Sequence, residues 1–62
     1  MSQLIEVEAI LLDETPEAYL LASDEDEPGN WVPMARVRAL TDMGSYVVVK
    51  MQERVAVNAN LV

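Results

Sequence analysis

Near its beginning, the chain alternates apolar and polar residues with a period of two, which indicates a β-strand over residues 4–12. Glu6 and Glu8 share one face of this strand and are expected to project into solvent together. The opposite face is wholly apolar and is expected to face the core; it consists of Ile5, Val7, Ala9 and Leu11.

Asp13-Glu14-Thr15-Pro16 is expected to form the turn that ends this strand, because Pro16 lacks a backbone donor and biases Thr15 away from helical angles. Residues 17–23 then predict a second antiparallel strand, with Tyr19 and Leu21 on one face. A helix is the alternative for this segment, since its Ala-Tyr-Leu-Leu-Ala stretch contains good helix formers.

Residues 23–30 predict a solvated loop, because four consecutive carboxylates precede the turn signal Pro28-Gly29. Trp31-Val32 resumes a short strand, and Pro33 restricts that strand to an edge or an early end because it removes a ladder donor. Residues 34–40 are ambiguous; Arg36 and Arg38 share a face if the segment is extended.

Residues 41–44 predict another turn, and residues 45–50 are the clearest strand, with a β-branched run in which Val47 and Val49 are expected to be buried. From Met51 onward the spacing favours a short C-terminal helix, but several mediocre helix formers leave a strand open over residues 51–62. The apolar helical face would comprise Met51, Val55, Asn58, Ala59 and Val62.

These elements together predict one mainly β domain over residues 1–62, a small antiparallel curled sheet or partly open barrel of four to five strands, closed by a short C-terminal helix if that helix forms. No internal repeat or linker divides the chain. A domain of this size buries only about 60% of the surface that its unfolded chain exposes, which leaves little room for a catalytic cleft.

The sequence contains neither cysteine nor histidine, so neither a disulfide nor a Cys/His zinc site is available to cross-link the domain. This composition fits a reducing cytosol. Residues 1–6 have no basic region, and Glu6 and Glu8 interrupt any apolar segment, so no signal peptide is expected. The longest apolar run, residues 18–22, is far shorter than the roughly 18 residues of a membrane span. We therefore expect a soluble cytoplasmic protein without a membrane partner.

Eleven acidic and four basic side chains give a formal net charge of −7 at pH 7. A negative field of this density repels phosphate backbones, so direct binding of nucleic acid is not expected. The same field raises the encounter rate with positively charged surfaces, an effect that salt weakens. A basic protein partner is therefore favoured.

The residue inventory argues against a metal site and against catalysis. Asp24, Asp26 and Gly29 match the first, third and sixth positions of a calcium-binding loop, but Pro28 is at the fifth position and Ala35 is where the bidentate Glu is needed. No histidine is present to activate a serine, and two glycines do not make a phosphate loop. We expect a protein that is not an enzyme and needs no cofactor.

The aromatic residues Tyr19, Trp31 and Tyr46 have the chemistry of a stacking platform for single-stranded nucleic acid, but the charge balance opposes that use. Core or interface anchors are the favoured interpretation, with Trp31 as the best candidate for an interface hot spot if it is exposed.

The acidic residues allow two interpretations. In the first, they only keep the protein soluble. In the second, rows of carboxylates imitate a nucleic-acid backbone and occupy an Arg/Lys groove that otherwise holds phosphates. The candidate partner-binding residues are Glu6, Glu8, Asp13, Glu14, Glu17, Asp24, Glu25, Asp26, Glu27 and Trp31.

Residues 14–21, Glu-Thr-Pro-Glu-Ala-Tyr-Leu-Leu, and the following Trp31-Val32-Pro33 resemble a pattern of very small proteins from bacteriophages and other mobile elements. That pattern reads E-T-x-x-A-x-L-[LV] and then W-[IV]-P-x-S, and it spans the middle half of this chain. Ala35 stands where the pattern has serine, so a turn-capping hydroxyl is missing. The motif is structural and contains no catalytic residue.

A compact, strongly acidic protein of this kind resembles an anti-CRISPR inhibitor of the DNA-mimic kind. The resemblance implies a protein of the host cytosol that blocks the basic nucleic-acid channel of a bacterial defence complex. It fixes no inhibitory residue, so the acidic positions above rest on charge alone. The alternative is a small structural or assembly module, homodimeric through an edge strand, whose acidity only confers solubility.

Overall fold

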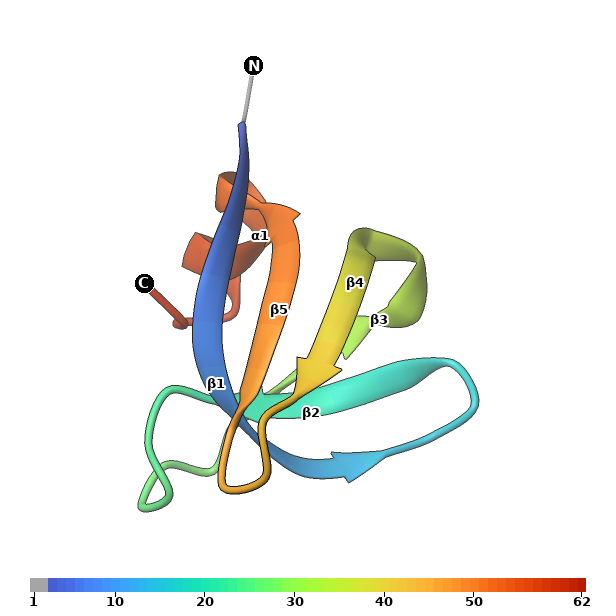
Figure 1. Ribbon diagram of the computed structural model, residues 1–62. Coiled ribbons are helices and arrows are strands. Elements are labelled where there is room, and N and C mark those ends of the chain that lie inside the picture. The colour runs from blue at the N-terminus through green and yellow to red at the C-terminus, as the bar shows by residue number, and fades with distance from the viewer. Residues whose placement is uncertain (1–2) are drawn as a thin grey trace.

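The computed structural model describes residues 3–62; Met1 and Ser2, part of the segment considered above for a signal peptide, lie outside them. Five antiparallel strands form one open sheet (Figure 1). A 3-10 turn joins the third and fourth strands, and a short helix follows the fifth. This confirms the predicted mainly β fold. The elements are β1 (Leu4–Glu14), β2 (Ala18–Ala22), β3 (Asn30–Pro33), η1 (Met34–Arg36), β4 (Val37–Asp42), β5 (Val47–Gln52) and α1 (Glu53–Asn58).

β1 is the longest strand and belongs to both halves of the sheet. Residues 4–9 pair with β5 and residues 10–14 pair with β2, which gives the strand order β3-β2-β1-β5-β4. The register shifts between Leu11 and Asp13, so Leu12 forms a bulge, and a bulge bends a strand and increases its twist. The two halves of the sheet therefore curl around a common interior, as Figure 1 shows.

The interior is filled by aliphatic side chains, and within residues 3–62 no buried side chain is polar or charged. The predicted alternation of β1 is confirmed, since Val7 and Ala9 are buried while Glu6 and Glu8 are exposed. The predicted burial of the central residues of β5 is confirmed as well. The buried core comprises Val7, Ala9, Leu21, Val32, Val47, Val49, Met51, Ala56, Ala59 and Leu61.

The turn between β1 and β2 is shorter than predicted, because Asp13 and Glu14 belong to β1 and only residues 15–17 form the turn. Thr15 explains the shorter turn. Its Oγ1 accepts hydrogen bonds from the backbone N–H of Glu17 at 3.3 Å and of Ala18 at 3.1 Å, and its own N–H donates to the Ala18 carbonyl at 2.8 Å. The hairpin closed in this way makes residues 18–22 a strand rather than the alternative helix.

The turn between β4 and β5 lies two residues later than predicted, so residues 41–42 end β4 and residues 45–46 belong to the turn. The Asp42 carboxylate accepts the backbone N–H of Gly44 at 2.8 Å, and the N–H of Met43 donates to the Tyr46 carbonyl at 2.9 Å. Gly44 has a φ of 100°, which favours glycine. The local hydrogen bonds of the turn thus fix where β5 begins.

The ambiguous segment over residues 34–40 divides into η1 and the start of β4, so Arg36 and Arg38 do not lie on one extended strand. β4 also contains a bulge, because its register with β5 shifts between Val37 and Ala39. The position of η1 follows from Pro33, whose backbone ends β3 and whose φ of −58° begins the 3-10 turn.

The C-terminal segment is both strand and helix, since residues 51–52 end β5 and α1 follows directly. The predicted helical face is wrong in part: Asn58 and Val62 are exposed, while Ala56 and Leu61 are buried. Leu61 replaces Val62 in the core because the helix ends at Asn58 and Asn60 then takes a left-handed φ of 59°. The N–H of Leu61 then donates to the Ala56 carbonyl at 2.9 Å, which turns Leu61 into the core. Within residues 3–62, no helix has the length and apolar character to cross a membrane.

Met51→Ala is expected to lower the free energy of unfolding by about 2–5 kcal/mol, because the Met51 side chain is 0% exposed and its removal leaves a cavity beneath α1. Lys50→Ala is the matched control, since the neighbouring Lys50 is exposed, and it should cost less than about 1 kcal/mol. Urea denaturation followed by circular dichroism measures both variants. Equal losses in the two variants would contradict the burial of Met51.

Candidate functional site

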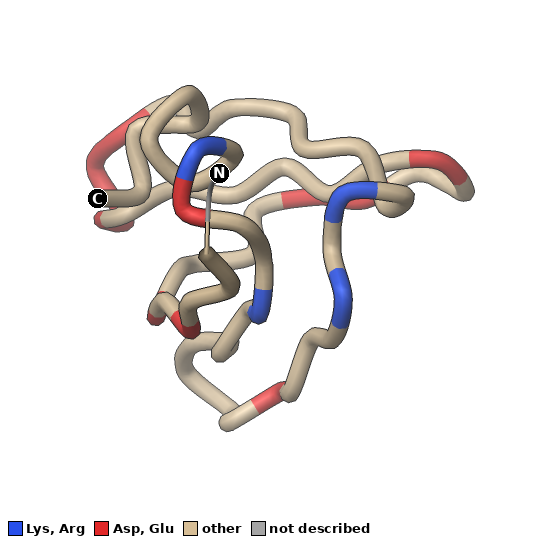
Figure 2. The backbone as a smooth tube through the Cα atoms, turned by 90° about the horizontal axis from the view of Figure 1, so that it is seen from above, with Lys and Arg blue, Asp and Glu red and all other residues tan. Residues whose placement is uncertain are grey.

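Charge is unevenly distributed along the chain. Nine of the eleven acidic residues precede residue 28, and all four basic residues follow residue 35. The basic residues belong to η1, β4, β5 and α1, whereas most acidic residues belong to β1, to the β1–β2 turn and to the loop after β2. In space the two kinds are not separated into two sides: Glu6 of β1 lies directly opposite Lys50 of β5, and Figure 2 shows acidic and basic positions next to each other.

The acidic loop over residues 23–29 is held in shape by its own hydrogen bonds. The Ser23 hydroxyl donates to the Glu27 carboxylate at 2.7 Å, and the Asp24 carboxylate accepts the N–H of Asp26 at 3.3 Å. Gly29 ends the loop with a φ of 78°, where a Cβ would lie 2.9 Å from the Leu12 side chain. Glu25 stands at the tip of this restrained loop and is exposed.

The fold brings Glu25 to Glu8 of β1. Both residues line a shallow depression of about 320 Å³, together with Ser45 and Tyr46 of the β4–β5 turn. We call this surface the acidic depression; it is lined by Glu8, Ala9, Ile10, Ser23, Glu25, Ser45 and Tyr46. Two carboxylates distant in the sequence thus share one concave surface with an aromatic ring.

The other predicted acidic residues divide between the neighbourhood of the acidic depression and the far end of the β1–β2 hairpin. Glu6 continues the outer face of β1 beside Glu8. Asp13, Glu14 and Glu17 lie at the hairpin turn, separated from the acidic loop by the length of β2, about 17 Å at the usual strand rise. The ten predicted partner-binding residues are therefore not one continuous surface.

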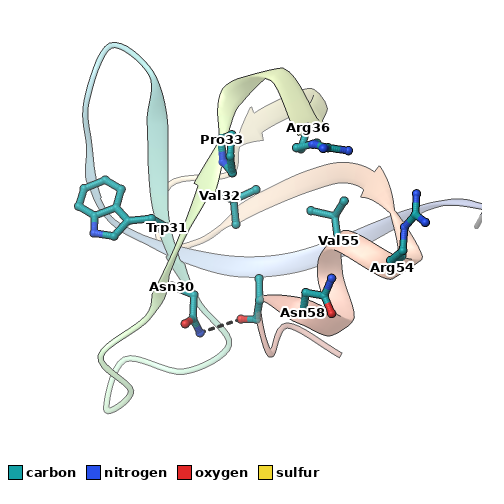
Figure 3. A pocket seen from close by; sticks show the side chains of 9 residues that line it. Asn30, Trp31, Val32, Pro33, Arg36, Arg54, Val55 and Asn58 are labelled. Atoms are coloured by element: carbon teal, nitrogen blue, oxygen red, sulfur yellow. Dashed lines mark hydrogen bonds between the residues drawn. The ribbon is translucent and has the colours of Figure 1, made fainter.

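The three aromatic residues do not form one platform. Trp31 is 50% exposed, and its position opposite Leu20 in the β2–β3 pairing places it on the other face of the sheet from Tyr19, which lies opposite Val32. Figure 3 shows the Trp31 ring directed away from Val32. Trp31 thus meets the condition of exposure that a hot spot requires, and its strand is an edge as predicted, but the ring lies apart from the acidic depression.

A second concave surface was not predicted from the sequence. This β3–α1 groove, of about 520 Å³, lies between β3 with η1 and the helix α1. Asn30 crosses its lower end, where its Nδ2 donates to the Ala59 carbonyl at 3.0 Å (Figure 3). The groove is lined by Asn30, Trp31, Val32, Pro33, Arg36, Arg54, Val55, Asn58 and Ala59. No motif joins these two segments in the sequence, because only the curl of the sheet brings β3 beside α1.

The side chains at these two surfaces can bind charged and apolar groups. Within residues 3–62, no group of three or more His, Cys, Asp or Glu side chains is arranged to hold a metal ion. Exposed carboxylates beside a ring, as in the acidic depression, suit the binding of a cationic side chain. No family model, curated protein or solved structure matches this chain.

Asn30→Ala is expected to lower the free energy of unfolding by about 0.5–1.5 kcal/mol, because it removes the part-buried hydrogen bond to the Ala59 carbonyl. Asn58→Ala is the matched control, since Asn58 is exposed like Asn30 and lines the same groove but is not the donor of this bond. Thermal and urea denaturation compare the two variants. If Asn58→Ala destabilised the protein as much as Asn30→Ala, the Asn30–Ala59 hydrogen bond would not be the interaction that stabilises the packing of β3 beside α1.

Proposed function

We propose that this protein is a non-enzymatic binding protein whose exposed carboxylates engage a basic, nucleic-acid-binding surface of a protein partner. The observation that supports this most directly is the convergence of Glu8 and Glu25 on one depression beside Tyr46. An arginine or lysine side chain entering the acidic depression would meet two carboxylates and the face or edge of a ring.

The carboxylates of this surface are preorganised. Glu8 stands on the part of β1 that pairs with β5, and the loop that bears Glu25 is restrained by the hydrogen bonds of Ser23 and Asp24. Ordering a flexible side chain or loop on binding costs affinity, so a restrained acidic surface loses less of its interaction energy than a free acidic tail would.

Long-range electrostatics favour the same partner class. The net charge of −7 attracts a basic surface and raises the rate of encounter with it. A partner groove that normally holds phosphates offers the matching row of cations. In this proposal the protein imitates a nucleic-acid backbone in its charge, and the resemblance to mobile-element proteins points to a bacterial defence complex, as for an anti-CRISPR inhibitor.

Assembly through an edge strand, the alternative function, has less support. The edge strand β3 has four residues and includes Pro33, which offers no donor to a new strand. The other edge strand, β4, has a bulge near Arg38 and ends at the exposed Asp42. Short, bulged and charged edges are features that prevent strand addition along the full length of a sheet.

Replacing both depression carboxylates by Glu8→Gln and Glu25→Gln is expected to weaken binding of an arginine-rich peptide about tenfold, because each exposed pair contributes up to about 1 kcal/mol. The matched control is Asp13→Asn with Glu14→Gln, which removes the same charge at the hairpin end and should change affinity by about twofold. Fluorescence anisotropy at low and moderate salt measures both. If the two double variants weakened binding equally, the net negative charge and not the acidic depression would account for the binding.

A captured natural partner should be released by DNA. We expect the immobilised protein to retain a nucleic-acid-binding protein from nuclease-treated bacterial lysate, and duplex DNA to elute it at constant salt, because both ligands use the same cationic groove. Elution with uncharged dextran is the control. A captured protein that stays bound in the presence of DNA would contradict mimicry of a nucleic-acid backbone.

A further inference from the structure

The β3–α1 groove lies where the sheet fails to close. β3 is an edge of the sheet, and its outer side has no strand partner within residues 3–62. Asn30 ties the lower end of the groove to α1 through the Ala59 carbonyl, so the two walls are fixed relative to each other. Its volume of about 520 Å³ falls in the range of about 300–1,000 Å³ that is usual for ligand sites.

The hydrogen-bonding pattern of β3 shows what its outer edge offers. The N–H of Met34 donates to the Glu17 carbonyl at 2.8 Å, so this pair is a hydrogen-bonded pair of the antiparallel ladder. Alternation along the β2–β3 register then makes Val32 and Asn30 bond to β2, while Trp31 and Pro33 direct their backbone groups outward. Trp31 therefore presents an N–H and a carbonyl to a guest segment, and Pro33 presents only a carbonyl.

The floor and one end of the groove set two further requirements for a ligand, an apolar group and a negative charge. Val32 and Val55 form an apolar floor between the walls. Arg36 of η1 and Arg54 of α1 line the groove, and Figure 3 shows their guanidinium groups on the same side of it, beyond Pro33. The groove thus combines one backbone pairing position, an apolar surface and a cationic end.

We propose that the β3–α1 groove binds the C-terminal end of a partner polypeptide. The bound segment is extended and pairs with the backbone of Trp31, its last apolar side chain rests on the partly exposed Val55, and its terminal carboxylate lies at the Arg36 end. This site is independent of the acidic depression and of the function proposed for it.

A chain terminus fits this groove better than an internal acidic segment. Strand pairing cannot continue past Pro33, because Pro33 has no N–H. A segment that pairs with Trp31 therefore has no further backbone partner beyond Pro33, where the arginine side chains line the groove. A terminal carboxylate satisfies that end without further pairing, in the manner known for C-terminal recognition at sheet edges. A terminus also brings a single negative charge toward a protein of charge −7, whereas an acidic segment brings several.

The test uses the full ¹⁵N-labelled protein and a short peptide of alternating threonine and valine that ends in valine with a free carboxylate. We expect shifts of the Trp31 indole and of the amides of Asn30 and Val55, with a Kd of about 0.1–1 mM. The same peptide with an amidated end should bind about tenfold more weakly, because the charge-assisted hydrogen bonds at the Arg36 end are lost.

Arg36→Gln is expected to weaken binding of the free-carboxylate peptide about fivefold or more, and to leave the amidated peptide nearly unchanged. Arg38→Gln is the matched control, since Arg38 is an equally charged neighbour that does not line this groove, and its effect should stay within about twofold. Thermal denaturation of both variants confirms that each is folded.

Several outcomes would overturn the proposal. Equal binding of the acid and amide peptides would exclude recognition of the terminus, and so would an absence of shifts in the groove at about 5 mM peptide. An amidated peptide with an internal glutamate that binds as tightly would assign the groove to acidic segments. If concentrating the protein alone produced the same shifts, the occupant would be a second copy of this chain.

Discussion

The pairing of β1 with β5 along one half of its length and with β2 along the other half holds the whole molecule together. The bulge at Leu12 lets one continuous strand take part in both halves while the sheet bends around the core. A domain of this size has little apolar area to bury, and its stability depends on bringing both halves of the sheet and α1 onto the same few aliphatic side chains. Without the bend in β1, the two halves would not face each other, and the aliphatic side chains of each half would be exposed to water.

Both concave surfaces follow from this bend. The outer face of β1 carries Glu8 to the region where the loop after β2 and the β4–β5 turn meet, which creates the acidic depression. The same bend moves β3 around until it faces α1, and the space left between them is the β3–α1 groove. The first surface is acidic with a tyrosine, and the second is apolar with two arginines. Their chemistry suits different ligands, a cationic side chain for the first and a chain terminus for the second.

Glu25 and Asp24 illustrate why exposed acidic residues are not equivalent. Asp24 is occupied in holding the loop through the N–H of Asp26, and Glu27 accepts the Ser23 hydroxyl. Glu25, between them, faces the depression. A run of four carboxylates thus divides into residues that shape the loop and a residue positioned to meet a partner, and charge reversal of the whole run would change both properties together.

The sequence by itself determined the fold class, the exposed and buried faces of β1 and β5, the edge position of the Trp31 strand and the acidic character of the protein, because period-two alternation, β-branched runs and proline act locally. It did not determine the ends of the turns, where the side chains of Thr15 and Asp42 bond the backbone, nor the buried face of α1, which depends on the left-handed turn at Asn60. Only the tertiary structure decided that Glu8 and Glu25 line one depression and that Arg36 and Arg54 line one groove. Bringing residues distant in the sequence together in this way depends on strand register and on the curl of the sheet, which are long-range properties that no local pattern of residues encodes.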